Sequence, residues 1–239
     1  MAPSSLHAIE HGRPATLQTY AAIAAALSLD LRLDLVDPRR RAASARAEDP
    51  VHAAMGELIA GRLNGYGRPV AIDEPYQHFQ FSGRADVMSW DLERRALIHV
   101  ENRTRFPNLQ DAIGSYNAKR RYLPATMAER LRLRGGWASV TNVMVGLWSS
   151  EVLHVTRLRR VTFRSICPDP ASDFLSWWSG SAPAPGPSTS TFVLFDPTSP
   201  LGGRQRMFVD LDSALEPSAR PRLRGYADAL ERLSRSGRA

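Results

Sequence analysis

The sequence predicts an α/β protein in which a mixed β-sheet is flanked by helices and preceded by a small helical appendage at the N-terminus. Apolar residues recur at helical spacing in residues 17–27 and 51–64. Strand-like runs rich in apolar and β-branched residues follow between residues 70 and 103 and again at 139–148. Helical and strand patterns that alternate along one chain are typical of layered α/β folds.

Composition restricts the partners. The chain has 239 residues and a mass of 26.5 kDa, which is enough for one large or two small domains. Its 31 basic residues exceed 24 acidic ones, giving a formal charge of +7 and a pI near 10.3. Such a surface attracts polyanions, either nucleic acid or an anionic membrane. Lys119 is the only lysine. Codon bias therefore explains the arginine excess as well as selection does, and a single arginine is weak support for a site.

Several classes of protein are excluded by what the sequence lacks. Cys167 is the only cysteine, which rules out an intramolecular disulfide and a Cys-rich zinc site and predicts a buried thiol in a reducing cytoplasm. No apolar run is long enough to span a bilayer and the N-terminus has no signal-peptide pattern, so we expect a cytoplasmic protein with no membrane partner. The six histidines lack zinc-enzyme spacing, and no serine-hydrolase, P-loop or dinucleotide-binding motif occurs.

Two stretches read as linkers and divide the chain. Residues 38–50 are rich in arginine and alanine, and residues 179–190 are rich in Pro, Gly and Ser. They leave an N-terminal module (1–37), a body (51–178) and a C-terminal hairpin and helix (191–239). The N-terminal module is too short to be stable alone, so it must dock or dimerise.

The N-terminal module is expected to contain a short helix at residues 4–11, a helix at 17–27 capped by Thr16, and a strand at 29–35. The run SSLHAIEHGRPATLQTYAAIAAALSLDLRLDLV resembles the second half of a Cro/repressor-type (XRE) helix-turn-helix domain. The resemblance implies DNA binding, with residues 4–11 as a recognition helix that presents Ser5 and His7.

In that family two helices precede the recognition helix, and they are not found before residue 4. We therefore expect either a gene start placed too late or a partial helix-turn-helix that no longer binds DNA in the usual way. The alternative is a docking helix and strand that cover the body or form the seam of a homodimer.

The body is expected to open with the helix at 51–64, where Glu57 lies off the centre of the apolar stripe, and to continue with strands at 70–74, 77–81, 85–90 and 97–103. A hairpin turning at residues 92–95 pairs Trp90 with Leu97 and so places Asp86 opposite Glu101. Opposed side chains on one face have Cβ atoms about 4.5–5.5 Å apart. Two carboxylates this close repel each other unless a cation intervenes, and Mg²⁺ is the only cofactor that the sequence indicates.

The run GRADVMSWDLERRALIHVENR resembles the PD-(D/E)XK nuclease-like fold, which implies a restriction-endonuclease-like mixed sheet. In that resemblance Asp86 and Glu101 hold the metal, Glu57 is a further acidic ligand from the first helix, and Arg103 stands where the family has lysine. The catalytic set of an active enzyme would be Asp86, Glu101 and Arg103. A guanidinium, however, stays protonated and cannot act as a base.

Three interpretations of the body therefore stay open. The one we favour is a catalytically silent nuclease-like domain in a DNA-binding, transcription-regulator-like protein, so that enzyme activity is not expected. The second is a Mg²⁺-dependent DNA endonuclease. The third is a different fold, with Asp86 and Glu101 in weak surface ion pairs with Arg84, Arg103 or Arg105.

Basic stretches follow the hairpin. Lys119, Arg120 and Arg121 lie in the helix-like run LQDAIGSYNAKRRYLP and are the expected contacts to DNA phosphates, and a second stretch spans residues 157–164. The alternative for each is a solvated helix face. The C-terminal part is expected to form two strands, TFVLFDP and RMFVDLD, and a helix at 218–234.

Overall fold

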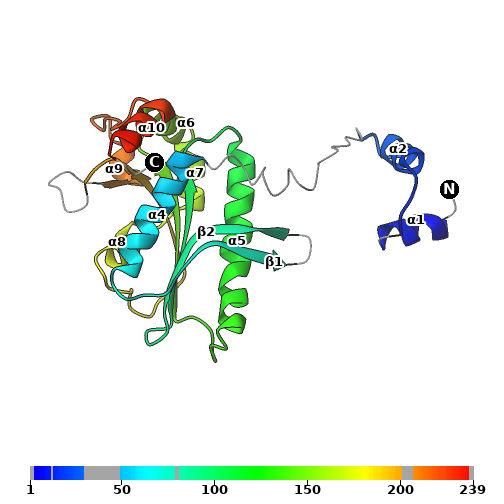
Figure 1. Cartoon of the computed structure of the whole chain (residues 1–239), viewed down its shortest axis with the longest axis horizontal. Coiled ribbons are helices and arrows are strands. Elements are labelled where there is room, and N and C mark those ends of the chain that lie inside the picture. The colour runs from blue at the N-terminus through cyan, green and yellow to red at the C-terminus, as the bar shows by residue number, and fades with distance from the viewer. Residues whose placement is uncertain (1–2, 12, 30–48, 79–80, 201–206, 237–239) are drawn as a thin grey trace. The chain divides into compact units, whose positions relative to one another are not determined.

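The computed structural model describes residues 3–11, 13–29, 49–78, 81–200 and 207–236 (Figure 1). The chain divides into two compact units, Met1–Ala47 and Glu48–Ala239. Each unit is described by itself.

The first unit contains two short helices, α1 (Pro3–Glu10) and α2 (Leu17–Ala26). The Thr16 hydroxyl accepts a hydrogen bond from the backbone N–H of Thr19 at 3.2 Å, which caps α2 at the expected residue. No residue of α2 is buried. The strand expected at 29–35 lies outside the described residues after Leu29.

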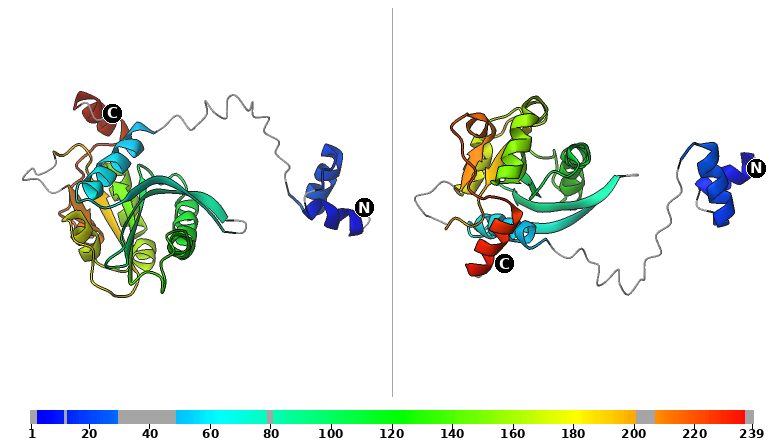
Figure 2. Two further views of the ribbon diagram at one scale, coloured as in Figure 1. Left: turned by 60° about the horizontal axis from the view of Figure 1, so that its bottom comes forward. Right: turned by 90° about the horizontal axis from the view of Figure 1, so that it is seen from above.

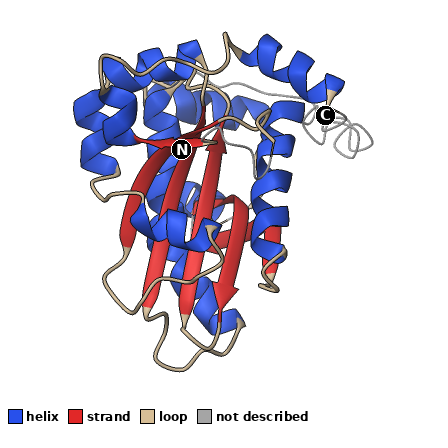
Figure 3. Cartoon of the chain, turned by 90° about the vertical axis from the view of Figure 1, so that its left-hand side faces the viewer, coloured by secondary structure: helices blue, strands red, loops and turns tan. Residues whose placement is uncertain are grey.

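The second unit is built on one six-stranded mixed sheet, so the predicted α/β class with a mixed sheet is confirmed (Figure 3). Its first three strands are antiparallel, the third to fifth are parallel, and the sixth is antiparallel to the fifth. In spatial order, which is also chain order, the strands are β1 (Val70–His78), β2 (Phe81–Asp91), β3 (Ala96–Arg103), β4 (Ser139–Leu147), β5 (Thr189–Phe195) and β6 (Phe208–Asp210).

Helices cover both faces of this sheet, with α4 and α5 on opposite sides of the first three strands (Figure 2). Among the described residues, no helix is both long enough and apolar enough to cross a membrane. The helices are α4 (Pro50–Asn64), α5 (Leu109–Arg130), α6 (Ser150–Leu158), α7 (Arg160–Ile166), α8 (Ser172–Trp178), α9 (Leu211–Leu215) and α10 (Tyr226–Arg235).

Strand β3 separates the two faces. Ile98 and Val100 pack in the larger apolar core with α4, whereas Leu97 packs with Leu123 and Met127 of α5. Successive side chains of a strand point to opposite faces, so His99 and Glu101 share the α5 face with Leu97. The alternation along β3 thereby places His99 and Glu101 under α5.

The expected division at residues 179–190 differs from the structure. Strand β5 begins at Thr189 and pairs with β4, so this segment connects two elements of the same sheet. Residues 191–239 are accordingly part of the second unit rather than a separate tail. The helix expected at 218–234 begins only at Tyr226, and the strand expected at 77–81 is shared between the end of β1 and the start of β2.

Candidate functional site

Strands β2 and β3 diverge at Asp86 and Glu101. The two strands pair from Asp91↔Ala96 to Val87↔Val100, which is the register predicted from the hairpin. Beyond that point β2 stays paired only with β1, while β3 stays paired with β4 as far as Arg103. Asp86 and Glu101 therefore lie where the two strands separate, and we call this place the carboxylate fork.

The separation follows from a rotation of β2 at Asp86. Ala85 and Met88 both pack in the apolar cluster under α5, although an odd number of positions separates them. A regular strand would put them on opposite faces. The neighbouring strand is distorted at the same level, where Asp73 adopts a positive φ of 51°.

The Asp86 side chain bridges the two strands at the fork. Its Oδ2 accepts a hydrogen bond from the backbone N–H of Asn102 at 2.7 Å, so a carboxylate replaces a bond of the β-ladder. The same oxygen lies 3.1 Å from His52 Nε2 on α4 and 4.0 Å from the Arg103 guanidinium. Asp86 thus connects both strands to α4.

Glu101 is fully buried, and both of its carboxylate oxygens already have partners. Oε2 accepts from Lys119 Nζ at 2.5 Å and from Arg103 Nη2 at 3.2 Å. Oε1 accepts from His99 Nε2 at 3.0 Å. A buried carboxylate is tolerated only when it is paired and hydrogen-bonded in this way.

A polar chain runs from Glu101 to the loop before β5. His99 Nδ1 faces Asn142 Oδ1 at 3.4 Å, and the Asn142 amide donates to Ser188 Oγ and to the Thr189 carbonyl. Both ring nitrogens of His99 therefore have a side-chain oxygen as neighbour. This chain fixes the orientation of the Glu101 carboxylate.

His52 and Asp86 influence each other's protonation. The hydrogen bond to Asp86, with the nearby negative charges, raises the pKa of His52 above 6.5 although burial opposes the shift. Burial alone would raise the pKa of Asp86, but the hydrogen bond from His52 and the positive charges of His52, Lys119 and Arg103 lower it below 3.8. The pair is therefore ionic at mildly acid pH.

Asp49 positions His52. Its carboxylate caps α4 by accepting from the backbone N–H groups of Val51 and His52. It also accepts from the hydroxyls of Thr104, which follows β3, and Tyr226, which begins α10. Burial would raise the pKa of Asp49, but these hydrogen bonds hold it below its usual value.

The fork does not fit the Mg²⁺ ion expected from the sequence. The Arg103 guanidinium lies between the two carboxylates, within 3.2 Å of Glu101 and 4.0 Å of Asp86, in the space that a shared divalent ion would need. Lys119 and Arg103 balance the two negative charges. The described residues also contain no group of three or more His, Cys, Asp or Glu side chains suited to a metal.

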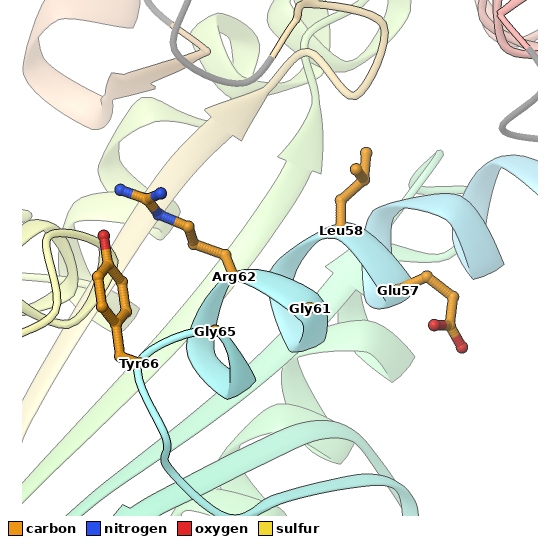
Figure 4. A pocket seen from close by; sticks show the side chains of 6 residues that line it. All are labelled: Glu57, Leu58, Gly61, Arg62, Gly65 and Tyr66. Atoms are coloured by element: carbon orange, nitrogen blue, oxygen red, sulfur yellow. The ribbon is translucent and has the colours of Figure 1, made fainter.

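Glu57, expected as a third metal ligand, is not brought to the fork. It is exposed and lines a shallow pocket of about 250 Å³ on α4 together with Arg62 and Tyr66 (Figure 4). His52 occupies the place near Asp86 instead. Glu57 lies five positions after His52 on α4, which turns their side chains roughly 140° apart around the helix.

The basic residues expected to contact DNA have different environments. Lys119 is buried against Glu101 and does not present its charge to solvent as expected, whereas Arg120 is half-buried and donates a hydrogen bond to the Ile166 carbonyl. Arg121 is exposed, as are Ser5 and His7 on α1. The expectation for a phosphate-binding helix face is thus corrected for Lys119, which is buried.

Sequence reasoning missed the roles of His52, Asn142 and Lys119 in the fork. The only available signal was that Lys119 is the single lysine among thirty arginines. In the three comparisons with known proteins, no family model, curated sequence or solved structure matches the chain.

Proposed function

We propose that the chain is a DNA-binding protein of the transcription-regulator type, whose second unit is a nuclease-like domain that does not cleave DNA. The observation that supports a loss of DNA cleavage is the position of the Arg103 guanidinium between the Asp86 and Glu101 carboxylates. Its guanidinium supplies the positive charge that a nuclease would obtain from a metal ion, and it cannot deprotonate water.

The nuclease-like part of the proposal is supported by the fork. An acidic residue on one strand and another on the next, followed two positions later by a basic residue, is the pattern implied by the PD-(D/E)XK resemblance, with Arg103 in the place of the family's lysine. The two carboxylates lie where β2 and β3 separate, and Arg103 is within 4.0 Å of Asp86 and 3.2 Å of Glu101. Buried polar clusters of this kind are retained for a structural or functional reason because they are costly to satisfy.

DNA binding is supported by charge that the fold does not neutralise. Arg121, Arg132, Arg134, Arg159 and Arg160 are exposed, and none forms an ion pair within the described part of the chain. Exposed guanidinium groups are the usual contacts to backbone phosphates. Together with the net charge of +7, they favour a polyanionic partner.

A second candidate function, a metal-dependent endonuclease, is favoured by Lys119. The only lysine of the chain reaches the buried carboxylate at 2.5 Å. Lysine, unlike arginine, can lose its proton when buried and can orient or deprotonate water. The reaction would require the Arg103 side chain, which is 21% exposed, to leave the fork.

Two assays on the full chain separate these functions. In a gel shift with duplex DNA, affinity should fall roughly 10²–10³-fold between 50 and 200 mM salt if about five phosphates are contacted. Incubation of supercoiled plasmid with Mg²⁺ or Mn²⁺ should produce no nicking beyond that of buffer.

Asp86→Asn and Glu57→Gln are the matched variants, one inside and one outside the fork. Nicking by the wild type that Asp86→Asn abolishes and Glu57→Gln retains would establish the endonuclease and overturn the silent domain. The absence of any salt-dependent shift would remove DNA binding from the proposal.

A further inference from the structure

Asn102 places a polar side chain in the apolar core between α4 and β3. The residue is fully buried, and its neighbour on β4 is Val145, which belongs to the larger apolar core. Its backbone groups have partners, because the N–H donates to Asp86 and the carbonyl accepts from Arg103. Within the described residues, neither Oδ1 nor Nδ2 of the side chain has a hydrogen-bond partner.

An unpaired amide in this place is costly. Moving an amide from water into an apolar environment is unfavourable unless new hydrogen bonds replace those to water, and buried side-chain amides are nearly always paired. The side chains around Asn102 on this face include Val87, Val100 and Val145, which carry no donor or acceptor. We therefore expect the partner of the Asn102 amide to come from outside the chain.

Gly56 leaves room for such a partner. It is buried in the middle of α4 and lies against Asn102. Outside the backbone of α4 and the two adjacent residues, a Cβ at Gly56 would meet only two atoms within 4 Å in the described part of the chain, Asn102 Nδ2 at 3.7 Å and Val87 Cγ2 at 3.9 Å. A methyl group, which is close in size to a water molecule, therefore fits without a clash. Neither crowding nor helix propensity favours glycine over alanine here.

The chemistry of this space fits water. The Asn102 amide offers donors at Nδ2 and an acceptor at Oδ1, and water both accepts and donates, whereas a metal ion would use only the acceptor and an anion only the donors. The space at Gly56 lies over the preceding turn of α4, because helical Cα–Cβ bonds point toward the N-terminus. The carbonyl oxygens of that turn each have a second lone pair. A water molecule there has an amide on one side and carbonyls on the other, which are the polar partners that a buried water needs.

We propose that Gly56 and Asn102 form a binding site for a structural water molecule between α4 and β3. The water pairs the Asn102 amide, and Gly56 supplies the space that any side chain would fill. The site is independent of the proposed function, because it rests on the buried amide and not on DNA or on a metal ion at the carboxylate fork.

Urea unfolding of the full chain, followed by circular dichroism, tests the site through the sign of one substitution. Gly56→Ala should lower the urea midpoint, because the methyl group displaces the water and leaves the amide unpaired. Gly61→Ala is the matched control on the same helix. A Cβ at Gly61 would meet no described atom within 4 Å outside α4, so this variant should raise the midpoint through helix propensity. A rise for Gly56→Ala like that for Gly61→Ala would overturn the proposal.

Asn102→Leu separates loss of the water from a steric effect of the methyl group. Leucine has nearly the shape of asparagine but no polar atom in its side chain, so the water has no amide to bind. In this background Gly56→Ala should raise the midpoint instead of lowering it. The same decrease in both backgrounds would show a steric effect and contradict the proposal.

Nuclear magnetic resonance of the full chain with isotopically labelled asparagine detects the water itself. Rotating-frame Overhauser transfer from water to the Asn102 side-chain amide protons should occur in the wild type and be lost in Gly56→Ala. The sign of the transfer separates a bound water from proton exchange. Its absence in the wild type would also overturn the proposal.

Discussion

Lys119 Nζ lies 2.5 Å from Glu101 Oε2, and both side chains are buried under α5 although the residues are far apart in sequence. This contact joins the middle of α5 to the end of β3. The only lysine of the chain therefore contacts Glu101, and Glu101 is the only fully buried glutamate among the described residues.

Lys119→Met should be strongly destabilising. The substitution leaves Glu101 buried with Arg103 as its ion-pair partner and His99 as a hydrogen-bond partner. Breaking a buried ion pair from one side costs about 3–5 kcal/mol of unfolding free energy. Urea unfolding followed by circular dichroism measures the change. Lys119→Met with Glu101→Gln should be less destabilised than Lys119→Met alone, and equal losses would show that the pair is not coupled.

Asp49→Ala should destabilise the protein more than Tyr226→Phe. The first variant removes the α4 cap and leaves two hydroxyl donors without an acceptor, for a loss of roughly 2–3 kcal/mol. The second removes one hydrogen bond, worth about 0.5–1.5 kcal/mol. Thermal unfolding of both variants checks the order, and a Tyr226→Phe loss as large as that of Asp49→Ala would contradict the capping role.

The His52–Asp86 pair predicts a pH-dependent stability. The folded pKa of His52 is raised, so its contribution is complete below pH 6.5 and is lost as the pH rises through the raised value. The folded pKa of Asp86 is lowered, so its contribution is present above pH 3.8 and is lost as the pH falls through the lowered value. The pair therefore stabilises most between these limits.

The measurement is the unfolding free energy of the wild type and His52→Gln from mildly acid to alkaline pH. The difference between the two proteins should be largest at mildly acid pH and should shrink toward alkaline pH. Because His52 is 34% exposed, solvent screens part of the effect. A difference that grows with rising pH would contradict the assignment.

Reversing the charge of exposed arginines, one pair at a time, should identify the surface that binds DNA. Arg132→Glu with Arg134→Glu lies just after α5, and Arg159→Glu with Arg160→Glu lies at the junction of α6 and α7, where Arg160 begins α7. Substitution of the pair that contacts phosphates should weaken DNA binding at low salt. It should also reduce the slope of log affinity against log salt concentration by about two if both side chains make contacts. Binding unchanged in both double variants would assign the contacts to other residues.

The fold could be predicted from the sequence where a short turn fixes the pairing of two strands. The register of β2 and β3 followed from the turn at residues 92–95, because the length of a hairpin turn sets which residues pair. The end of the second unit was predicted less well. The Pro- and Ser-rich segment before Thr189 looked like a boundary, but it is a connection between two strands of one sheet.

The fork could be predicted only in part. Asp86 and Glu101 were expected to meet, but the rotation of β2 that lets Asp86 reach Asn102 and His52 breaks the regular period on which the prediction relied. The choice of His52 over Glu57 depends on how α4 is turned against the sheet. Lys119 reaches the site only through the packing of α5, which periodicity does not specify.

The central claim is that Arg103 occupies the place between Asp86 and Glu101 that a divalent ion would need. Titration of Mn²⁺ into the full chain, followed by isothermal calorimetry, tests it most directly. The wild type should show no saturable binding, Arg103→Gln should bind Mn²⁺, and adding Asp86→Asn to that variant should abolish the binding. Saturable binding by the wild type that Asp86→Asn removes would contradict the claim.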